Sequence, residues 1–254
     1  MKVRSRRAAG ARARKPPAKI ILCVGLKSSG STWLYNVVIR LLKETRSGKT
    51  AAFYADRVAL FPKGSEQAQF LVVKSHVPSE PLLFVTRLTR GQVFLTIREP
   101  RDSVVSLMQR FSFSFDAALK DVAEEAARIV EFSRTRDIVL LRYEDGFHED
   151  RKTIAEVAAL IGVRAPKALQ QKIFKALTSD AVKRKIRNLK AQGVFGAAPK
   201  PEHFDPATHW HPGHVGDGRT GKYAEFLSAA QQEEVLARTR AYCKRFGYLR
   251  ARKR

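Results

Sequence analysis

The sequence predicts a three-layer α/β/α fold, in which helices cover both faces of a central parallel sheet. Short apolar runs alternate along the 254 residues with longer stretches of helical periodicity, and this alternation is typical of parallel strands joined by helical crossovers. The runs are apolar throughout, as expected of strands buried on both faces. With 44% hydrophobic residues the chain can bury a sizeable core, which excludes intrinsic disorder as its overall state.

The individual elements follow from the two periodicities. Strands are predicted over residues 20–24, 70–73, 92–97 and 137–141. Helices are predicted over residues 31–44, 102–112, 117–134, 149–161, 166–177 and 228–245. Asp102 and Ser228 suit helix starts, because a short side-chain oxygen can accept a free first-turn N–H. Residues 191–222 are rich in Gly and Pro and predict a long loop, of the kind that often serves as a lid.

The chain is strongly basic, since 48 Lys and Arg against 24 Asp and Glu give a formal charge of +24. That excess favours an anionic partner, which can be nucleic acid, anionic lipid or a small molecule with several phosphates. Residues 1–19 carry eight cations and no acid, and residues 250–254 carry four cations. We therefore expect a disordered basic tail at 1–19, a single domain over 20–249 and a short basic tail at 250–254.

Residues 20–26 form an apolar run after a basic start, but they do not predict a secretory signal. The run is short, it passes directly into Lys27, and no small-residue cleavage site follows it. No stretch reaches the roughly 18 uncharged apolar residues that span a bilayer. We therefore expect a cytoplasmic protein without a transmembrane segment. The two cysteines, Cys23 and Cys243, suggest neither a disulfide framework nor a cysteine metal site.

The first predicted strand leads into a turn with the spacing of a phosphate-binding P-loop. Gly25-x4-Gly30-Ser31-Thr32 has that spacing, except that Ser31 stands where a P-loop has Lys. Glycine permits close backbone approach, successive N–H groups can surround phosphate oxygens, and the next helix adds its dipole. Further charge and donors come from the side chains of Lys27, Ser28, Ser29, Ser31 and Thr32. Taken alone, this segment can also be an ordinary Ser/Gly-rich loop. If it binds phosphate, the predicted fold is of the P-loop NTPase-like kind.

Polar side chains also follow the other predicted strands. Arg98 and Ser106 come after the strand at 92–97 and can converge on one phosphate, because Arg offers a planar fork and the hydroxyl a further donor. Lys74 and His76 follow the strand at 70–73, where a neutral imidazole can accept a proton from a bound hydroxyl. Tyr143 follows the fourth strand. Since ligands of parallel α/β sheets bind at such strand ends, we expect these groups to share one site.

Together these segments resemble the cytosolic type of sulfotransferase, which transfers a sulfuryl group from 3′-phosphoadenosine 5′-phosphosulfate (PAPS) to an acceptor. The family's R-x-P-x-D-x-x-x-S motif is matched in full by residues 98–106, and residues 27–33 are similar to its P-K-S-G-T-T-W turn. Residues 74–78 are similar to K-T-H-x-P, 143–145 to Y-E-D, and 218–223 to the closing G-x-x-G-x-W. Each motif alone is a weak signal, but five in the family's order over residues 20–248 are a strong one.

The resemblance implies a transferase that binds PAPS, releases adenosine 3′,5′-bisphosphate (PAP) and uses no metal. It makes His76 the general base and adds Lys27 and Lys74 as candidate catalytic residues. The implied donor-binding residues are Lys27, Ser28, Ser29, Gly30, Ser31, Thr32, Trp33, Arg98, Ser106, Tyr143, Arg219 and Lys222. Among them, Arg98 and Ser106 would hold the 3′-phosphate, whereas Trp33 and Tyr143 would contact the adenine. The acceptor would be a hydroxyl or amine of a small molecule or carbohydrate.

Two departures from the family pattern affect these roles. The Lys of the family's turn aligns with Ser28, and Lys27 lies one place earlier, so either Lys27 or another cation would serve the leaving group. The family also has Arg-Lys directly before the closing Gly, where this chain has Gly216 and Asp217. Arg219 and Lys222 are therefore nearby but unaligned candidates for the 3′-phosphate.

Alternatives from other classes have less support in the sequence. A P-loop kinase or NTPase explains the turn equally well but not the other motifs, and a nucleic-acid-binding protein explains only the charge. The histidines of residues 209–214 lie among Pro and Gly and favour a gating loop over a metal site. Candidate aromatic walls for the acceptor, about half of which we expect in the core, are Phe53, Phe61, Phe111, Phe113, Phe115 and Trp210.

Overall fold

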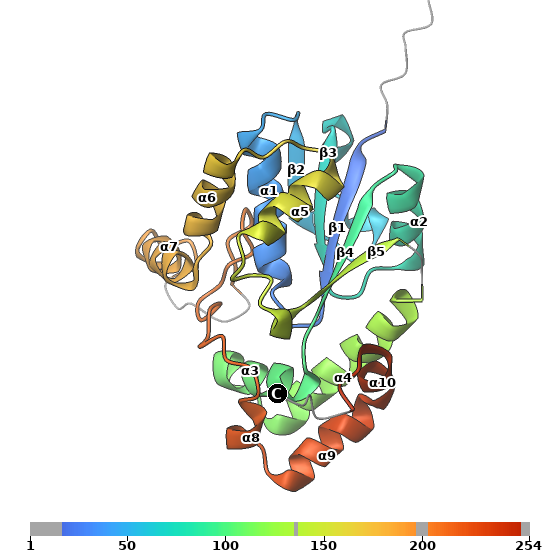
Figure 1. Cartoon of the computed structure of the whole chain (residues 1–254), viewed down its shortest axis with the longest axis vertical. Helices are drawn as coiled ribbons and strands as arrows, with labels where there is room; N and C mark the ends of the chain where they lie inside the picture. Colours follow the sequence, from blue (N-terminus) through green and yellow to red (C-terminus); the bar gives the residue numbers. More distant parts are fainter. Residues whose placement is uncertain (1–16, 135–136, 197–202, 250–254) are drawn as a thin grey trace, which may run out of the picture.

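The computed structural model describes residues 17–134, 137–196 and 203–249 (Figure 1). Within these residues one sheet has the strand order β2-β3-β1-β4-β5, and every neighbouring pair is parallel. Its strands are β1 (Lys19–Gly25), β2 (Thr50–Tyr54), β3 (Phe70–Ser75), β4 (Gln92–Ile97) and β5 (Ile138–Arg142). The predicted parallel sheet is therefore confirmed, and the carboxyl ends of its strands lie at one edge.

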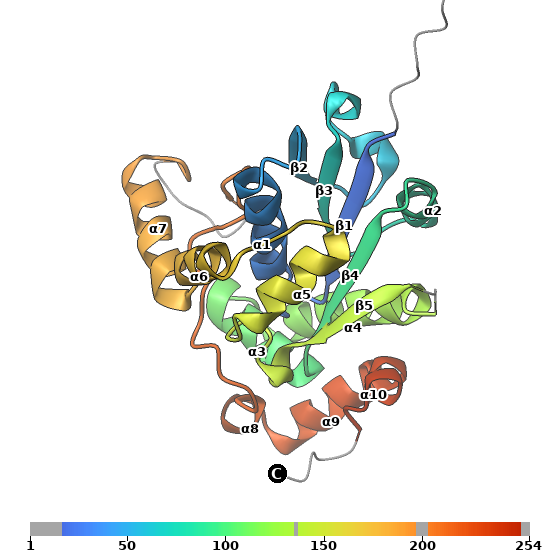
Figure 2. The ribbon, with the colours of Figure 1, turned by 45° about the horizontal axis from the view of Figure 1, so that its top comes forward.

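Helices cover both faces of this sheet, as the sequence predicts (Figure 2). One face carries α1 (Ser31–Glu44), α5 (Lys152–Ile161) and α6 (Lys167–Ala176), with α7 (Ser179–Ala191) beside α6. The other face carries α2 (Glu80–Leu88), α3 (Pro100–Phe111), α4 (Phe115–Phe132), α9 (Ala229–Arg238) and α10 (Arg240–Phe246). The short helices are α8 (Tyr223–Phe226), η1 (Val58–Leu60), η2 (Ser65–Gln67) and η3 (Tyr143–Asp145).

Strand β1 explains why the predicted strands read as apolar throughout. Ile20, Leu22 and Val24 point into the core shared with α3, α4 and α10. Ile21 and Cys23 point into the second core, shared with α1 and α5. Because both faces are covered, no position of the strand interior is left for a polar residue. Burial raises the pKa of the Cys23 thiol to about 12, so this cysteine is a core residue and stays protonated.

Several elements differ from the sequence prediction. Strand β2 and helix α2 were not expected, and β2 is a half-exposed edge strand whose small residues give no apolar run. Helix α7 was not among the predicted helices, although the basic run at residues 183–187, which we interpret from the sequence as a solvated helical face, lies within it. The predicted helix at 228–245 divides at Thr239 into α9 and α10. The Thr239 hydroxyl bonds back to the Val235 carbonyl at 2.6 Å, as Thr does where it competes with helix hydrogen bonding.

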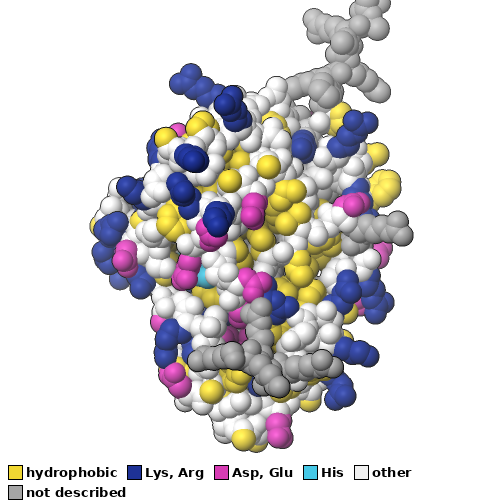
Figure 3. Space-filling view, in the orientation of Figure 1, with side chains coloured by type: hydrophobic (Ala, Val, Ile, Leu, Met, Phe, Trp, Pro, Cys, Tyr) yellow, Lys and Arg dark blue, Asp and Glu magenta, His cyan; other side chains and the backbone are white. Residues whose placement is uncertain are grey.

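The chain ends and the surface charge can be compared with the sequence predictions only within the described residues. The predicted tails lie outside the described residues except at residues 17–19, and β1 begins at Lys19, inside the predicted first tail. On the face shown in Figure 3, Lys and Arg side chains are spread around the molecule and do not form one continuous band. None of the helices over the described residues combines the length and apolarity needed to cross a membrane.

Candidate active site

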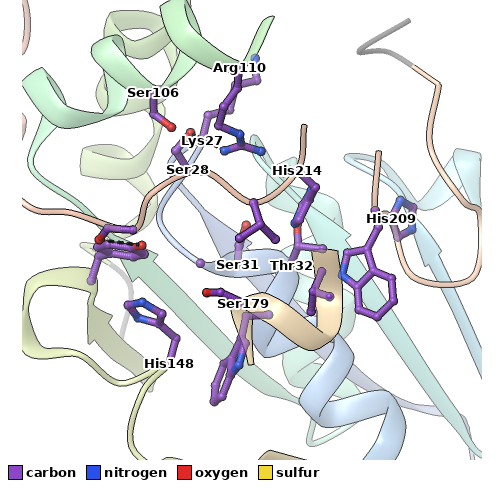
Figure 4. Close-up of a pocket in the computed structure, with 18 of the residues that line it drawn as sticks. Lys27, Ser28, Ser31, Thr32, Ser106, Arg110, His148, Ser179, His209 and His214 are labelled. Atoms are coloured by element: carbon purple, nitrogen blue, oxygen red, sulfur yellow. Dashed lines mark hydrogen bonds between the residues drawn. The ribbon is translucent and has the colours of Figure 1, made fainter. Parts of the chain in front are cut away.

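A cavity of about 630 Å³ lies at the carboxyl edge of the sheet and collects most of the predicted site residues (Figure 4). Parallel strands end together there: Val24 of β1 pairs with Ser75 of β3 and Leu95 of β4. Predicted residues that line the cavity are Lys27, Ser28, Gly30, Ser31, Thr32, Trp33, Lys74, His76, Arg98, Ser106, Tyr143 and Lys222. Ser29 and Arg219 are the predicted residues that do not line it.

The turn after β1 is fixed to the neighbouring strand β4. Gly25 lies so close to β4 that a Cβ at this position would be 2.0 Å from Thr96 Oγ1. The Ser29 hydroxyl is buried, donates to the Leu26 carbonyl at 2.6 Å and lies 2.6 Å from Thr96 Oγ1. Gly30 has φ +86° and caps α1, whose first N–H groups have no partner within the helix. The turn therefore offers an anion-binding helix start, while Ser29 acts as its internal brace.

Arg98 leaves β4 and reaches across this turn. The residue is 3% exposed, and its Nη1 and Nη2 donate to the carbonyls of Ser28 at 3.0 Å and Arg219 at 2.8 Å. Its backbone is held by Tyr242 of α10, whose hydroxyl accepts from Arg98 N at 3.1 Å and donates to Arg98 O at 3.0 Å. Arg98 Nε is buried and has no hydrogen-bond partner among the described residues. One donor of this guanidinium is thus free for a ligand.

Rings gather on the far side of the turn. Arg98 lies over the Tyr143 ring at 4.1 Å, and Tyr143 stacks on His148 with ring centroids 4.3 Å apart. Trp33 meets the edge of Phe147 at 5.8 Å. The buried atoms Trp33 Nε1 and His148 Nδ1 have no partner among the described residues. His148 was not predicted as a site residue. The only hint in the sequence is that it follows Tyr143 by five residues on the same loop. This end of the cavity offers a flat, partly polar slot that suits a heterocyclic base.

His76 and Lys74 lie between the turn and the open part of the cavity. His76 Nδ1 is 2.7 Å from the Gly25 carbonyl, which can only accept, so Nδ1 carries the proton. Nε2 then holds the lone pair and accepts from Lys74 Nζ at 3.0 Å. Burial, followed by the charge of Lys74, keeps the pKa of His76 well below its usual value. Burial also lowers the pKa of Lys74 to about 8, despite the nearby Glu125. His76 is therefore a neutral imidazole with its basic atom beside a cation.

Lys27 lines the cavity, but its ammonium is paired with two acids of α4. Its Nζ lies 2.5 Å from Asp121 Oδ2 and 3.1 Å from Glu125 Oε1, and its backbone N–H donates to Glu125 at 2.9 Å. Burial opposes the ammonium form, but Glu125 and Asp121 together raise the pKa of Lys27. Burial raises the pKa of Glu125 to about 7, against the pull of Lys27. These two partners could not be predicted from the sequence, because they lie on a helix, 94 and 98 residues further along the chain.

Residues 203–222, which we call the strap, run along the open side of the cavity. Phe204, His209, Trp210, His211 and His214 of the strap all line the cavity. Burial lowers the pKa of His209 and of His211 to about 4, so both are neutral at pH 7. The described residues contain no group of three or more side chains arranged to hold a metal ion. The strap thus lies where a gating loop was predicted, and its motion stays a prediction.

The predicted acceptor aromatics divide much as expected. Phe53 is buried in the core, and the partly buried Phe61 and Phe115 pack against that core. Phe111 and Trp210 line the cavity, and Phe113 is exposed.

The closing motif is fixed by Asp102, and the structure corrects its expected role. Asp102 was predicted to cap the helix that begins beside it, but Glu99 caps α3 instead. The Asp102 carboxylate accepts from the backbone N–H groups of Gly221 at 2.6 Å and Tyr223 at 3.0 Å. Lys222 is thereby brought to the cavity, where its Nζ donates to Gln109 at 2.9 Å. The half-exposed Arg219 side chain pairs with Asp217 and Glu225, so its role toward the donor stays a prediction.

Comparisons with known proteins extend the likeness to the whole fold. No family model matches the sequence, and no curated protein matches it. Mouse sulfotransferase SULT7A1, solved with PAP, is 14% identical over 91% of this chain and 86% of its own, with a TM-score of 0.65. Two structures of retinol dehydratase, one with retinol and PAP and one with androsterone and PAP, are each 13% identical. Both cover 89% of this chain and 81% of their own, with TM-scores of 0.59 and 0.60. At these identities the likeness concerns the fold: this chain has the fold of these PAP-bound structures.

Proposed function

We propose that this protein is a PAPS-dependent sulfotransferase. The observation that carries the proposal is the convergence on one cavity of a phosphate-binding turn, the Arg98 and Ser106 pair and the Lys74 and His76 pair. These are the motifs by which the sequence resembles the family, and they come from strands far apart in the chain. The shared fold with proteins solved in complex with PAP supports the same conclusion.

The residues present fit a nucleotide with phosphates at both ends of its ribose. Arg98 Nε, Trp33 Nε1 and His148 Nδ1 are buried polar atoms without partners among the described residues, and a polar ligand would supply the missing acceptors and donors. Arg98 and Ser106 would bind the 3′-phosphate, the start of α1 would bind the 5′ side, and the ring slot would hold the adenine. PAPS supplies a sulfuryl group already activated by its bond to phosphate.

His76 would act as the general base through Nε2. The acceptor oxygen would form a bond to sulfur while the bond from sulfur to the 5′-phosphate breaks, with its electron pair leaving on PAP. The acceptor proton would pass to His76 Nε2, whose partner Nδ1–H stays on the Gly25 carbonyl. Lys74, 3.0 Å from Nε2, would stand beside the charge that develops on the transferred group.

The acceptor would lie between His76 and the strap. Phe111, Phe204 and Trp210 would give this part of the cavity apolar walls, and the neutral rings of His209 and His211 would add hydrogen-bonding groups. An acceptor with a ring system and at least one hydroxyl or amine, such as a phenol, an alcohol of a larger apolar molecule or a sugar, fits this combination.

Nucleotide binding by the purified chain tests the proposal first. Isothermal titration calorimetry with PAP should show one site per chain, and PAP should raise the thermal midpoint of unfolding by mass action. Transfer of labelled sulfate from PAPS should then be measured with phenols, sugars and apolar alcohols. Absence of PAP binding would overturn the proposal, and magnesium-dependent ATP hydrolysis in its place would support the P-loop kinase or NTPase alternative.

A further inference from the structure

The phosphate-binding turn has the right geometry but lacks a free lysine. Ser28 stands where the resembled turn has its Lys, and the Lys27 ammonium is shared by Asp121 and Glu125 at 2.5 and 3.1 Å. The backbone N–H of Lys27 is tied to the same Glu125. Since two carboxylates surround one ammonium, Lys27 brings no surplus positive charge to the turn. A donor that carries a phosphosulfate would need that charge from elsewhere in the cavity.

Arg110 of α3 brings a guanidinium to the position that the missing lysine leaves (Figure 4). It lies one helical turn after Ser106, so the two side chains share the face of α3 that lines the cavity. Arg110 Nη1 donates to Ser28 Oγ at 3.1 Å. Arg98 donates to the carbonyl of the same Ser28 at 3.0 Å, so two guanidinium groups meet at one residue of the turn.

The charge of Arg110 is not balanced by an acid within the described part of the chain. Among the described residues no Asp or Glu forms an ion pair with it, whereas Arg101, Arg219 and Lys27 are all paired. Burial, followed by repulsion from Arg98, lowers the pKa of Arg110 to about 10, which leaves it charged at neutral pH. The buried Arg98 and the half-buried Arg110 repel each other, and an anion between them removes both the repulsion and part of the desolvation cost.

The strap holds Arg110 in this position. Its Nη2 lies 3.2 Å from His211 Nε2, and its Nε donates to the Gly213 carbonyl at 3.0 Å. His211 Nδ1 lies 2.7 Å from the Pro212 carbonyl and therefore carries the ring proton, so Nε2 is free to accept from the guanidinium. The position of Arg110 on α3 and its contacts with His211 and Gly213 of the strap thus together direct its side chain toward the turn.

We propose that Arg110 is the cation that binds the 5′-phosphosulfate of the donor and meets the charge left on the phosphate when the bond to sulfur breaks. It replaces the lysine that the turn lacks at Ser28. This inference rests on the proposed function, because it assigns a residue to one end of the proposed donor. This role for Arg110 also explains why the turn keeps the rest of the phosphate-binding pattern although it has Ser28 in place of the lysine.

Comparison of two nucleotides isolates the contact. PAP and adenosine 3′-monophosphate differ only in the 5′-phosphate, so the ratio of their affinities, measured by calorimetry, reports what the protein gains from that group. Arg110→Gln should weaken PAP binding about tenfold to 100-fold, the range for hydrogen bonds to charged groups, and leave adenosine 3′-monophosphate binding at the wild-type level. Arg110→Lys should keep part of the ratio, because a point charge remains without the planar fork.

Two further variants make the test specific. Ser28→Lys in the Arg110→Gln background should restore most of the affinity ratio, since it returns a cation to the turn. Arg128→Gln, which removes an exposed arginine from α4, serves as the matched control and should leave both affinities unchanged. Lys27→Gln should reduce the ratio less than Arg110→Gln.

The outcomes separate the inference from the proposed function. If the wild-type chain binds PAP and Arg110→Gln keeps the wild-type ratio, Arg110 does not have this role and the proposed function stands. A larger loss for Lys27→Gln than for Arg110→Gln would assign the role to Lys27 instead. If the wild-type chain does not bind PAP, the proposed function fails and the inference with it. Circular dichroism of each variant confirms that the fold is intact, and Arg110→Lys provides the result if Arg110→Gln does not fold.

Discussion

The two sides of the cavity are built in different ways. At the sheet edge, site groups are hydrogen-bonded to neighbouring strands or to the turn after β1: His76 to Gly25, Ser29 to Thr96 and Arg98 to Ser28. On the strap, hydrogen bonds such as Thr208 Oγ1 to the Asp205 carboxylate and His211 Nδ1 to the Pro212 carbonyl join residues one to three positions apart. One contact that ties the strap to helix α1 is the Asn36 amide, which donates to the Thr208 carbonyl at 2.8 Å.

This difference indicates a division of labour. Under the proposed function, the groups that would recognise the donor and its leaving group lie where parallel strands end, because there the backbone of several strands holds them in place. The strap joins the site through side chains and a few loop contacts, so its geometry can vary with the acceptor at little cost to the sheet. In that function the donor side would be preorganised, and the acceptor side would be the adaptable one.

The largest expected effect comes from His76, the general base of the proposed function. His76→Asn should lower turnover about 10²-fold to 10⁴-fold, the usual contribution of a positioned general base, with PAP affinity preserved. Single-turnover sulfate transfer and calorimetry measure the two quantities. His209→Asn should cost less turnover. A larger loss of turnover for His209→Asn than for His76→Asn would assign the general base to the strap and contradict its assignment to the sheet edge.

A smaller effect is expected from Gly25, where the turn touches β4. Gly25→Ala places a Cβ 2.0 Å from Thr96 Oγ1 and 2.7 Å from Ser29 Oγ, so the strand or the turn must shift. We expect a loss of about 1–3 kcal/mol in the free energy of unfolding, measured with urea, together with weaker PAP binding. Combining it with Thr96→Ala removes the clashing hydroxyl, so the double variant should be less destabilised than the sum of the two single losses. Strict additivity would show that this contact does not set the turn.

The smallest expected effect is a pH dependence carried by the strap. The pKa of His211 is lowered to about 4 by burial and then by Arg110, and that of His209 to about 4 by burial and then by Lys74. Below about pH 6.5 the unfolded chain takes up protons that the folded chain does not, so stability is complete above that pH and falls toward pH 4. Lowering the pH from 7 to 5 should cost about 1–2 kcal/mol for each histidine.

The variant His211→Gln isolates this contribution. Glu125, whose pKa is raised to about 7 by burial, works in the opposite direction and is present in both proteins. Urea unfolding at pH 7 and pH 5 should therefore show a smaller loss for His211→Gln than for the wild-type chain. Equal losses would mean that the strap histidine is protonated freely in the folded state and that the strap is more open than the structure describes.

How much the sequence predicts depends on how far apart the interacting residues lie in the chain. The sheet, and site residues such as Arg98, Lys74 and His76, could be predicted because each of these residues follows directly on an apolar run. Arg110 and Glu125 could not be assigned, because their contacts with the turn span 82 and 98 residues. No local pattern distinguishes them from other helical charges. The role of Asp102 was wrong for the same reason, since its partners lie 119 and 121 residues away.

The contact between Tyr242 and the backbone of Arg98 sets the order in which the site can be completed during synthesis of the chain. The two residues are 144 positions apart, and the tyrosine lies on α10, the last described helix. At about 5–20 residues per second, the ribosome makes Arg98 roughly 7–30 s before the hydroxyl that holds it. A nascent chain therefore carries the turn after β1 well before Arg98 is fixed. Under the proposed function, nucleotide binding at this site would then require that α10 has been made.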